Sequence, residues 1–132
     1  MSLSEQQRMD LVKLYWEKYE DTWTELELSI KAAKWNMAAN RLYYSLFHAT
    51  TALFVKDGHK VGTHRGTKAA IGEHYVLTGK MSAEHGRLFA QLSSLRDKAD
   101  YDVIFKASEN EILLYVEQAK NFILRVKELL CE

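Results

Sequence analysis

The chain of 132 residues contains no proline and only six glycines. Proline cannot continue the backbone hydrogen bonding of a helix, and glycine is the next least favourable residue inside one. A sequence poor in both residues favours long, uninterrupted helices. The length suits a single domain with one core.

The sequence is also short of cysteine and of long apolar runs. Its single cysteine, Cys131, excludes a disulfide within the chain and fits a reducing compartment. The opening residues, MSLSEQQRMDLVK, lack the apolar segment of a signal peptide. No run approaches the ~20 apolar residues that cross a bilayer. We therefore expect a cytoplasmic protein without membrane association.

Net charge is absent as well, because eighteen Lys and Arg residues balance eighteen Asp and Glu residues. A protein that coats nucleic acid non-specifically is basic, so this class is excluded. One segment, residues 56–68, is locally basic, and it is either a solvated loop or a local anion site. Its charged and histidine residues are Lys56, Asp57, His59, Lys60, His64, Arg65 and Lys68.

Apolar residues recur at intervals of three and four along most of the chain, which is the spacing of one helical face. Two such stripes share the second segment, so we expect that helix to touch several neighbours. In the first segment, Trp16, Tyr19 and Trp23 are expected in the core or at a dimer surface. The predicted helices cover about residues 9–33, 35–57, 67–77, 82–99 and 108–130.

The ends of these segments carry helix-end residues. Gly58 suits the left-handed position after the second helix, and the loop GHKVGTHRG follows. Ser82 can cap the fourth helix, and Ser108 with Glu111 forms a capping box for the last. Short connections between long helices favour antiparallel neighbours. The sequence therefore predicts an all-α fold, an up-and-down bundle of four long helices plus one short helix, as one domain over residues 1–132.

Several catalytic and metal-binding patterns are missing. No glutamate is followed by histidine three residues later, as a di-iron bundle requires. HExxH, paired cysteines, GxSxG and a phosphate-binding glycine loop do not occur either. We expect no metal site and no cofactor.

Two polar clusters remain in segments that otherwise belong to the core. In NRLYYSLFH, residues 40–48, Arg41, Tyr44 and His48 lie on one helical face. In RDKADYD, residues 96–102, Arg96 and Asp100 are four apart and can pair. The polar face of the first cluster is expected to meet the helix end of the second. Two readings stay open: a ligand groove, or buried pairs that hold the helices together.

These segments resemble a known family. AANRLYYSLFHATTALF, then a loop containing HRG, then LRDKADY together resemble HEPN domains, in particular short stand-alone HEPN proteins with N-R-x-Y-Y and R-x-x-A-D-Y signatures. The resemblance extends from about residue 38 to the last helix. It implies a bundle of four to five helices, commonly a homodimer with a groove between protomers. Many such proteins act as the toxin partner of a minimal nucleotidyltransferase.

The same resemblance implies a candidate chemistry. Active HEPN proteins are metal-independent ribonucleases with an R-x4-6-H motif, in which histidine moves a proton and arginine stabilises the phosphate. Arg96 matches the arginine, but the histidine positions hold Tyr101, Asp102 and Val103. Arg41-x6-His48 has the right spacing but lies on the second helix. The motif is therefore incomplete, and Arg96 and His48 remain catalytic candidates only.

Three functions stay open. The first is a HEPN-type module that binds a nucleotide or RNA, a partner nucleotidyltransferase, or both, in a toxin–antitoxin-like pair. The second is a metal-independent ribonuclease toxin that uses Arg96 with His48 or His64. The third is a structural dimerisation domain with buried charge pairs. The expected ligand-binding residues are Arg41, Tyr44, His48, Arg96, Asp100 and Tyr101.

Overall fold

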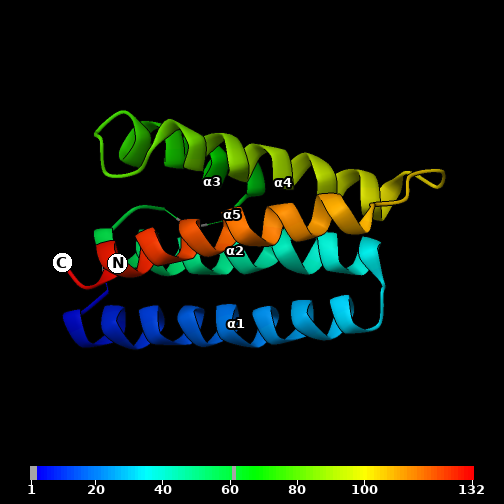
Figure 1. The fold of residues 1–132 in the computed structure, drawn as a ribbon. Coiled ribbons are helices and arrows are strands. Elements are labelled where there is room, and N and C mark those ends of the chain that lie inside the picture. The colour runs from blue at the N-terminus through cyan, green and yellow to red at the C-terminus, as the bar shows by residue number, and fades with distance from the viewer. Residues whose placement is uncertain (1–2, 61) are drawn as a thin grey trace.

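The computed structural model describes residues 3–60 and 62–132. Within these residues all regular structure is helical, and no helix is long and apolar enough to cross a membrane. The four long helices alternate in direction, which confirms the predicted up-and-down bundle (Figure 1). The helices are α1 (Glu5–Lys31), α2 (Trp35–Asp57), α3 (His64–Ile71), the π-helical turn η1 (Gly72–Val76), α4 (Ala83–Tyr101) and α5 (Glu109–Leu130).

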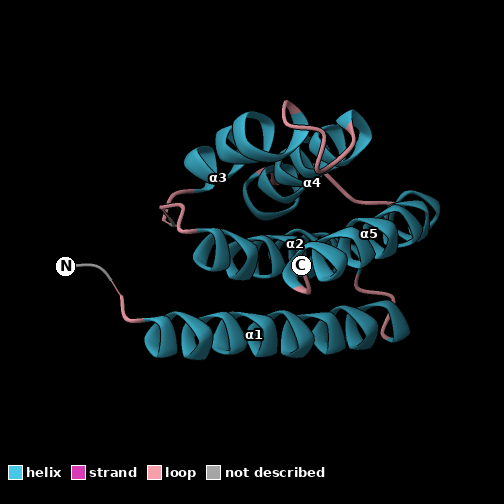
Figure 2. Ribbon diagram, turned by 90° about the vertical axis from the view of Figure 1, so that its left-hand side faces the viewer, coloured by secondary structure: helices cyan, strands magenta, loops and turns pink. Residues whose placement is uncertain are grey.

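The helices form three layers, with α1 in the first, α2 and α5 in the second, and α3 and α4 in the third (Figures 1 and 2). Helix α2 packs against α1, α4 and α5, so the prediction that it touches several neighbours is confirmed. Its two apolar stripes supply much of the core, including the fully buried residues Leu42, Tyr43, Leu46, Ala49 and Leu53.

Most helix ends follow the sequence signals. Gly58 takes a left-handed φ of 79° after α2, as predicted. Ser82 caps α4 and forms a capping box with His85. The Ser108 hydroxyl accepts a hydrogen bond from the Glu111 backbone at 3.2 Å. The Ser108 cap is therefore present, although Glu111 returns no side-chain hydrogen bond among the described residues.

The predicted start of the third helix is wrong. Helix α3 begins at His64, three residues before the expected Thr67, because Thr63 acts as its N-cap. The Thr63 hydroxyl accepts from the Gly66 backbone at 2.9 Å, and the Thr67 hydroxyl donates to the Thr63 carbonyl at 3.0 Å. His64 therefore lies in the first turn of a helix and not in a loop.

The apolar stripe of α1 is only partly covered. Leu26 is its one fully buried apolar residue, whereas Trp16, Tyr19 and Trp23 pack against the core from its edge. Met9 is 60% exposed. The cause is the layering: α1 packs on α2, and no Cα atom of α1 lies within 8 Å of a Cα atom of α5.

Candidate functional site

The polar residues of α2 meet the end of α4, as predicted. Asn40 donates a hydrogen bond from Nδ2 to Oδ2 of Asp100 at 2.9 Å. The expected pair of Arg96 with Asp100 is present but long, at 3.8 Å. Arg96 approaches its neighbour Asp97 more closely, at 3.0 Å, and the side chain of Asp97 is 58% exposed. These contacts place two carboxylates at the edge of one buried arginine.

Aromatic rings surround the Arg96 guanidinium. Its central carbon lies 5.4 Å from the ring centre of Tyr43, 5.6 Å from that of Tyr44 and 5.9 Å from that of Tyr101. Each distance is within the range of a cation–π interaction. Arg96 is 8% exposed and its buried Nε has no hydrogen-bond partner among the described residues, whereas Tyr101 is 75% exposed. We call Arg96 and these three tyrosines the tyrosine cage; its Tyr101 side is at the surface.

His64 reaches the cage from α3. Its Nδ1 lies 2.8 Å from the Tyr43 hydroxyl, and its ring centre is 4.7 Å from that of Phe47. Burial lowers the pKa of His64, and the positive charge of Arg96 lowers it further, with Asp97 opposing. The imidazole is therefore neutral at neutral pH, able to donate from one nitrogen and accept at the other.

Tyr43 keeps its proton. Burial raises the pKa of Tyr43 to about 12, although the nearby Arg96 charge acts in the opposite direction. A phenol with such a pKa does not ionise in the physiological range. The Tyr43 hydroxyl can therefore donate to His64 at any pH at which the protein works.

Arg41 and His48 face the other way, toward α1. Arg41 pairs with Glu25 at 2.8 Å and also donates to the Asn40 side chain at 2.7 and 3.0 Å. Burial lowers the pKa of His48 to about 4, and the charges of Lys18 and Arg41 contribute to the lowering. His48 is consequently neutral at pH 7.

Tyr44 connects the two sides of this region. The guanidinium carbon of Arg41 lies 5.5 Å from its ring centre, and that of Arg96 lies 5.6 Å from it. Its ring centre is also 6.0 Å from that of His48. Tyr44 thus lies between the expected residues that face α1, which are Arg41 and His48, and Arg96 on α4.

A family model described as HEPN domain matches residues 12–129. The chain belongs to the HEPN domain family. The resemblance carried by the N-R-x-Y-Y and R-x-x-A-D-Y segments is thereby confirmed, together with the all-α fold class.

Relatives of this HEPN domain span most of its length. A UPF0332 protein of Thermotoga maritima is 27% identical over 106 residues, which cover 80% of each chain. A UPF0332 protein of Archaeoglobus fulgidus is 24% identical over 119 residues, 90% of this chain and 94% of the relative. A protein of Methanocaldococcus jannaschii named "Putative toxin" is 23% identical over 123 residues, 93% of this chain and 83% of the relative.

In this HEPN domain the motif positions after Arg96 do not hold a histidine. Their residues, Tyr101, Asp102 and Val103, are all exposed. His64 lies near the arginine from another element, since the Arg96 charge contributes to lowering the pKa of His64. Its ring centre is 5.6 Å from that of Tyr43, against which the Arg96 guanidinium also packs at 5.4 Å. The sequence hypothesis that paired Arg96 with His48 or His64 therefore has its better geometry with His64.

Sequence reasoning missed part of this HEPN domain's site. Tyr43 stood in the quoted segment, but its apolar spacing assigned it to the core, where its ring indeed lies. Asn36 was also missed: it donates to the Phe105 carbonyl at 3.2 Å and accepts from the Ala107 backbone at 2.8 Å. The available signal for His64 was Thr63, which has the residue type of an N-cap.

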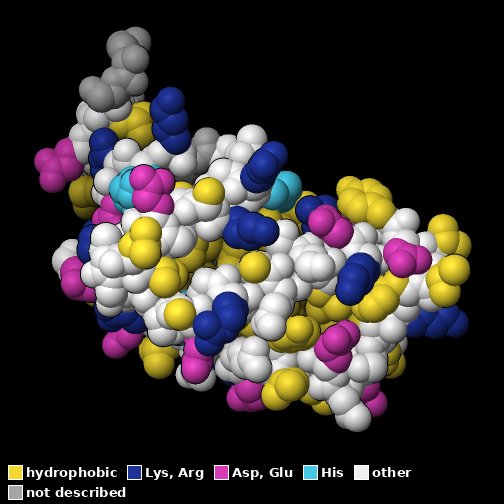
Figure 3. Space-filling model, turned by 90° about the horizontal axis from the view of Figure 1, so that it is seen from above, with side chains coloured by type: hydrophobic (Ala, Val, Ile, Leu, Met, Phe, Trp, Pro, Cys, Tyr) yellow, Lys and Arg dark blue, Asp and Glu magenta, His cyan; other side chains and the backbone are white. Residues whose placement is uncertain are grey.

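The locally basic segment does not gather into one site. Lys56 donates to the Leu129 carbonyl at 2.6 Å, near the C-terminal end of α5. Lys60, Arg65 and Lys68 are exposed. Seen from above the α3–α4 layer, Lys and Arg side chains are interspersed with Asp and Glu side chains (Figure 3). The solvated reading of this segment fits these positions better than a dedicated anion site.

Proposed function

We propose that this HEPN domain binds a nucleotide or single-stranded RNA at the tyrosine cage, as the toxin-like half of a pair with a minimal nucleotidyltransferase. One observation carries the binding proposal: the exposed Tyr101 ring packs on the guanidinium of the buried Arg96. Proteins that bind single strands combine aromatic rings, on which bases stack, with arginines that pair with phosphate.

Each part of the cage has a role in this proposal. A base stacks on the outer side of Tyr101, and the adjoining phosphate pairs with Arg96. Asp97 is the residue to be displaced, because its exposed ion pair with Arg96 contributes little to stability. His64 supplies a further hydrogen bond to the phosphate from its ring N–H.

The pairing with a partner rests on other support. A relative named as a toxin and the HEPN family itself favour the toxin-like role. The nucleotidyltransferase partner and the homodimer, in which two cages share one groove, come from the family resemblance. Both are part of the same proposal.

Fluorescence polarisation with labelled single-stranded RNA and labelled AMP tests the binding. Tyr101→Ala should weaken binding about tenfold or more, because stacking on one aromatic ring contributes ~1–3 kcal/mol. Ile104→Ala is the matched control, since Ile104 is 88% exposed, three residues after Tyr101, and lies outside the cage. Equal affinities for the two variants, or no binding by the parent protein, would overturn the proposal.

A second candidate function is metal-independent RNA cleavage, favoured by the position of His64 beside the same tyrosine as Arg96. In this reaction His64 removes the proton of a 2′-hydroxyl, and the 2′-oxygen forms a bond to the adjacent phosphorus. The bond from phosphorus to the 5′-oxygen breaks, and that oxygen takes up a proton. Arg96 stabilises the charge that develops on the phosphate.

Labelled RNA incubated with EDTA distinguishes cleavage from binding. Cleavage through His64 predicts 2′,3′-cyclic phosphate ends, loss of product in His64→Gln and Arg96→Lys, and little change in His48→Gln. Circular dichroism checks that each variant is folded. Intact RNA with the parent protein leaves binding as the function, and loss of cleavage in His48→Gln alone would assign the proton transfer to His48.

A further inference from the structure

A groove runs along α1 and α5, on a side of the molecule that the tyrosine cage does not use. One hollow of about 600 Å³ lies between the start of α1 and the end of α5. Smaller hollows continue it along the two helices. The apolar residues along its length include Met9, Trp16, Trp23, Ile30, Ile123 and Leu124.

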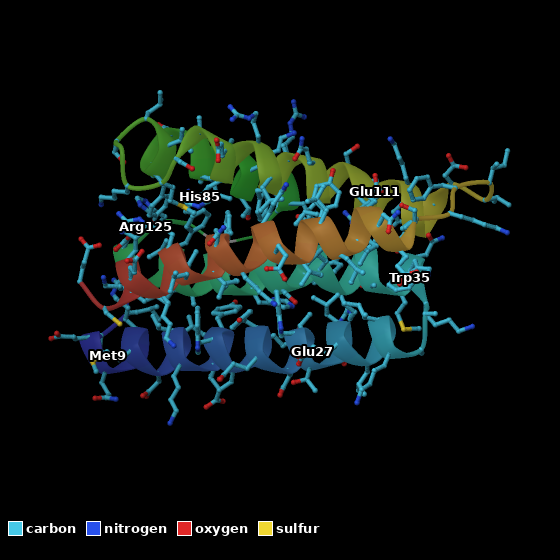
Figure 4. The ribbon with its side chains drawn as sticks, viewed as in Figure 1. Met9, Glu27, Trp35, His85, Glu111 and Arg125 are labelled. Carbon is cyan, nitrogen blue, oxygen red and sulfur yellow. The ribbon has the colours of Figure 1, made fainter. Side chains whose placement is uncertain are left out.

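The groove follows from the layered fold. Helices α1 and α5 both pack on α2 but belong to different layers, so a row of hollows remains between them. Figure 4 labels two residues that line the groove from α1, Met9 near one end of that helix and Glu27 toward the other. At 1.5 Å per residue, the distance from Met9 to Ile30 is about 30 Å, enough for a helix of about twenty residues.

The two rims of the groove carry opposite charges. On the α1 rim lie Glu17, Glu20 and Glu27, and on the α5 rim lie Lys120 and Lys127. Of these five, only Lys120 takes part in a described ion pair, with Glu117 on its own helix, and both partners are largely exposed. Such a pair contributes little and is easily exchanged.

Two basic residues of α1, Arg8 and Lys13, depart from this charge pattern. Lys13 lines the hollow near the start of α1. Arg8, at the same end, donates to the Val55 carbonyl at 2.8 Å and so serves the end of α2. Beyond Lys13, the α1 rim is acidic and the α5 rim is basic along the groove.

We propose that this groove binds an amphipathic α-helix of a partner protein. The apolar face of the helix fills the groove, its basic edge lies against α1, and its acidic edge lies against α5. A groove of this kind is a recurring way to bind a helix. Trp16 and Trp23 supply aromatic anchors of the type that dominates interface energies. The surface is independent of the RNA- or nucleotide-binding proposal.

A second copy of the chain suits the groove less well. In a two-fold contact each copy presents the same surface to the other, so one hollow would face another hollow. A single convex helix fills the groove and can match both rims at once. The opposite charges also fix its direction and its rotation about its own axis.

The test uses two synthetic helical peptides of about twenty residues, sized to the groove. Both carry the same apolar face; one has lysines on the α1-facing edge and glutamates on the α5-facing edge, and the other has lysines on both edges. Isothermal titration at low salt gives the affinities. We expect the first peptide to bind about tenfold or more tightly than the second, because the second places lysines against the basic α5 rim in either direction.

Two chain variants test the location. Leu124→Glu puts a charge into the groove, and Leu114→Glu is its matched control on the same helix, since the residues are 58% and 61% exposed. Only Leu124→Glu should abolish peptide binding. The double variant Lys120→Glu with Lys127→Glu makes both rims acidic, so it should reverse the preference in favour of the peptide with lysines on both edges. This reversal requires a folded protein, so a folding defect cannot produce it.

Each other outcome overturns the proposal. No binding of either peptide, equal binding of both, or equal effects of Leu124→Glu and Leu114→Glu would each contradict helix docking in this groove. So would a dimer of the parent protein that Leu124→Glu converts to a monomer without any peptide binding, since a second copy would then occupy the groove. RNA binding by the parent protein is measured separately and is unaffected by either result.

Discussion

The Tyr43 hydroxyl lies 2.8 Å from Nδ1 of His64 and joins α2 to the first turn of α3. This contact determines which nitrogen of His64 carries the proton. If Tyr43 donates, Nδ1 accepts and the proton is on Nε2, which can then donate to a phosphate. If Nδ1 donates, Nε2 is free to accept a proton from a 2′-hydroxyl. The Nε2–H tautomer therefore suits phosphate binding, and the Nδ1–H tautomer suits RNA cleavage.

We expect the Nε2–H tautomer in the free protein, because Tyr43, whose pKa is raised to about 12, retains a proton to donate. Nitrogen-15 NMR of the imidazole at neutral pH measures the tautomer directly. Tyr43→Phe should lose the preference and destabilise the fold by roughly 0.5–1.5 kcal/mol, the net contribution of one hydrogen bond. A dominant Nδ1–H signal in the parent protein would contradict this prediction and favour proton removal by His64.

The hydrogen bond between Asn40 and Asp100 should couple α2 to α4. A double-mutant cycle with alanine at each position should give an interaction energy of roughly 1–2 kcal/mol in urea unfolding, because the acceptor is charged and partly buried. Gln6 and Asp10, which form an exposed 2.8 Å bond within α1, are the control pair. Their cycle should give about 0.2–0.5 kcal/mol. Equal values for both pairs would mean that the hydrogen bond between Asn40 and Asp100 does not couple α2 to α4.

Removing Arg96 tests the structural dimerisation hypothesis. Arg96→Ala should reduce the free energy of unfolding by about 1–3 kcal/mol, since it loses cation–π contacts and the ion pairs with Asp97 and Asp100. The carboxylates left behind reach solvent, with side-chain exposures of 58% for Asp97 and 27% for Asp100. Thermal or urea unfolding provides the measurement. A loss of roughly 3–5 kcal/mol, typical of breaking a buried ion pair, would instead support the structural hypothesis.

His48 should make the fold less stable in mild acid. Burial holds the pKa of His48 near about 4, below its ordinary 6.5. The unfolded chain therefore binds the proton at higher pH than the folded one, and the unfolding free energy falls as the pH drops from 6.5 toward 4. Because the side chain is only partly buried, we expect a contribution of roughly 1 kcal/mol between pH 7 and 5.

The comparison of pH profiles isolates this residue. Histidines 59, 64 and 85 also have lowered pKa values through burial and contribute in the same direction. Urea unfolding at several pH values should therefore give a smaller decline in His48→Gln than in the parent protein. Parallel profiles for the two proteins would show that the titration of His48 is not linked to folding.

Asn36 should hold the connection between α4 and α5. Its side chain bonds to the backbone of Phe105 and Ala107 on either side of residue 106. Asn36→Ala should leave the Ala107 amide without its partner, cost about 1–2 kcal/mol and speed its hydrogen exchange. Asn110→Ala, at an exposed position in α5, is the control and should change neither. An unchanged exchange rate in Asn36→Ala would contradict this assignment.

The sequence predicted most helices because their signals are local. The period of apolar residues identified the four long helices, and Gly58, Ser82 and Ser108 marked their ends. The short helix was less well predicted. Its start depends on Thr63, which acts as the N-cap. The segment GHKVGTHRG has no apolar stripe, so helical periodicity did not extend the predicted helix back to His64.

The candidate site was predicted in part. The contact between NRLYYSLFH and RDKADY was expected, and Asn40 bonded to Asp100 confirms it. The sequence placed Arg41 and His48 with Arg96, but these two side chains turn toward α1. Residues on one helix share a broad face, and a spacing of three or four cannot tell which of two flanking helices each side chain meets.

The sequence by itself determined the all-α fold, the positions of the long helices and the family, since each depends on residues close together in the chain. The tertiary structure decided which groups meet. It brought His64 to Tyr43 from a position twenty-one residues away and left the apolar stripe of α1 half covered beside α5. Such contacts depend on how layers of helices pack, and helical periodicity alone does not specify that packing.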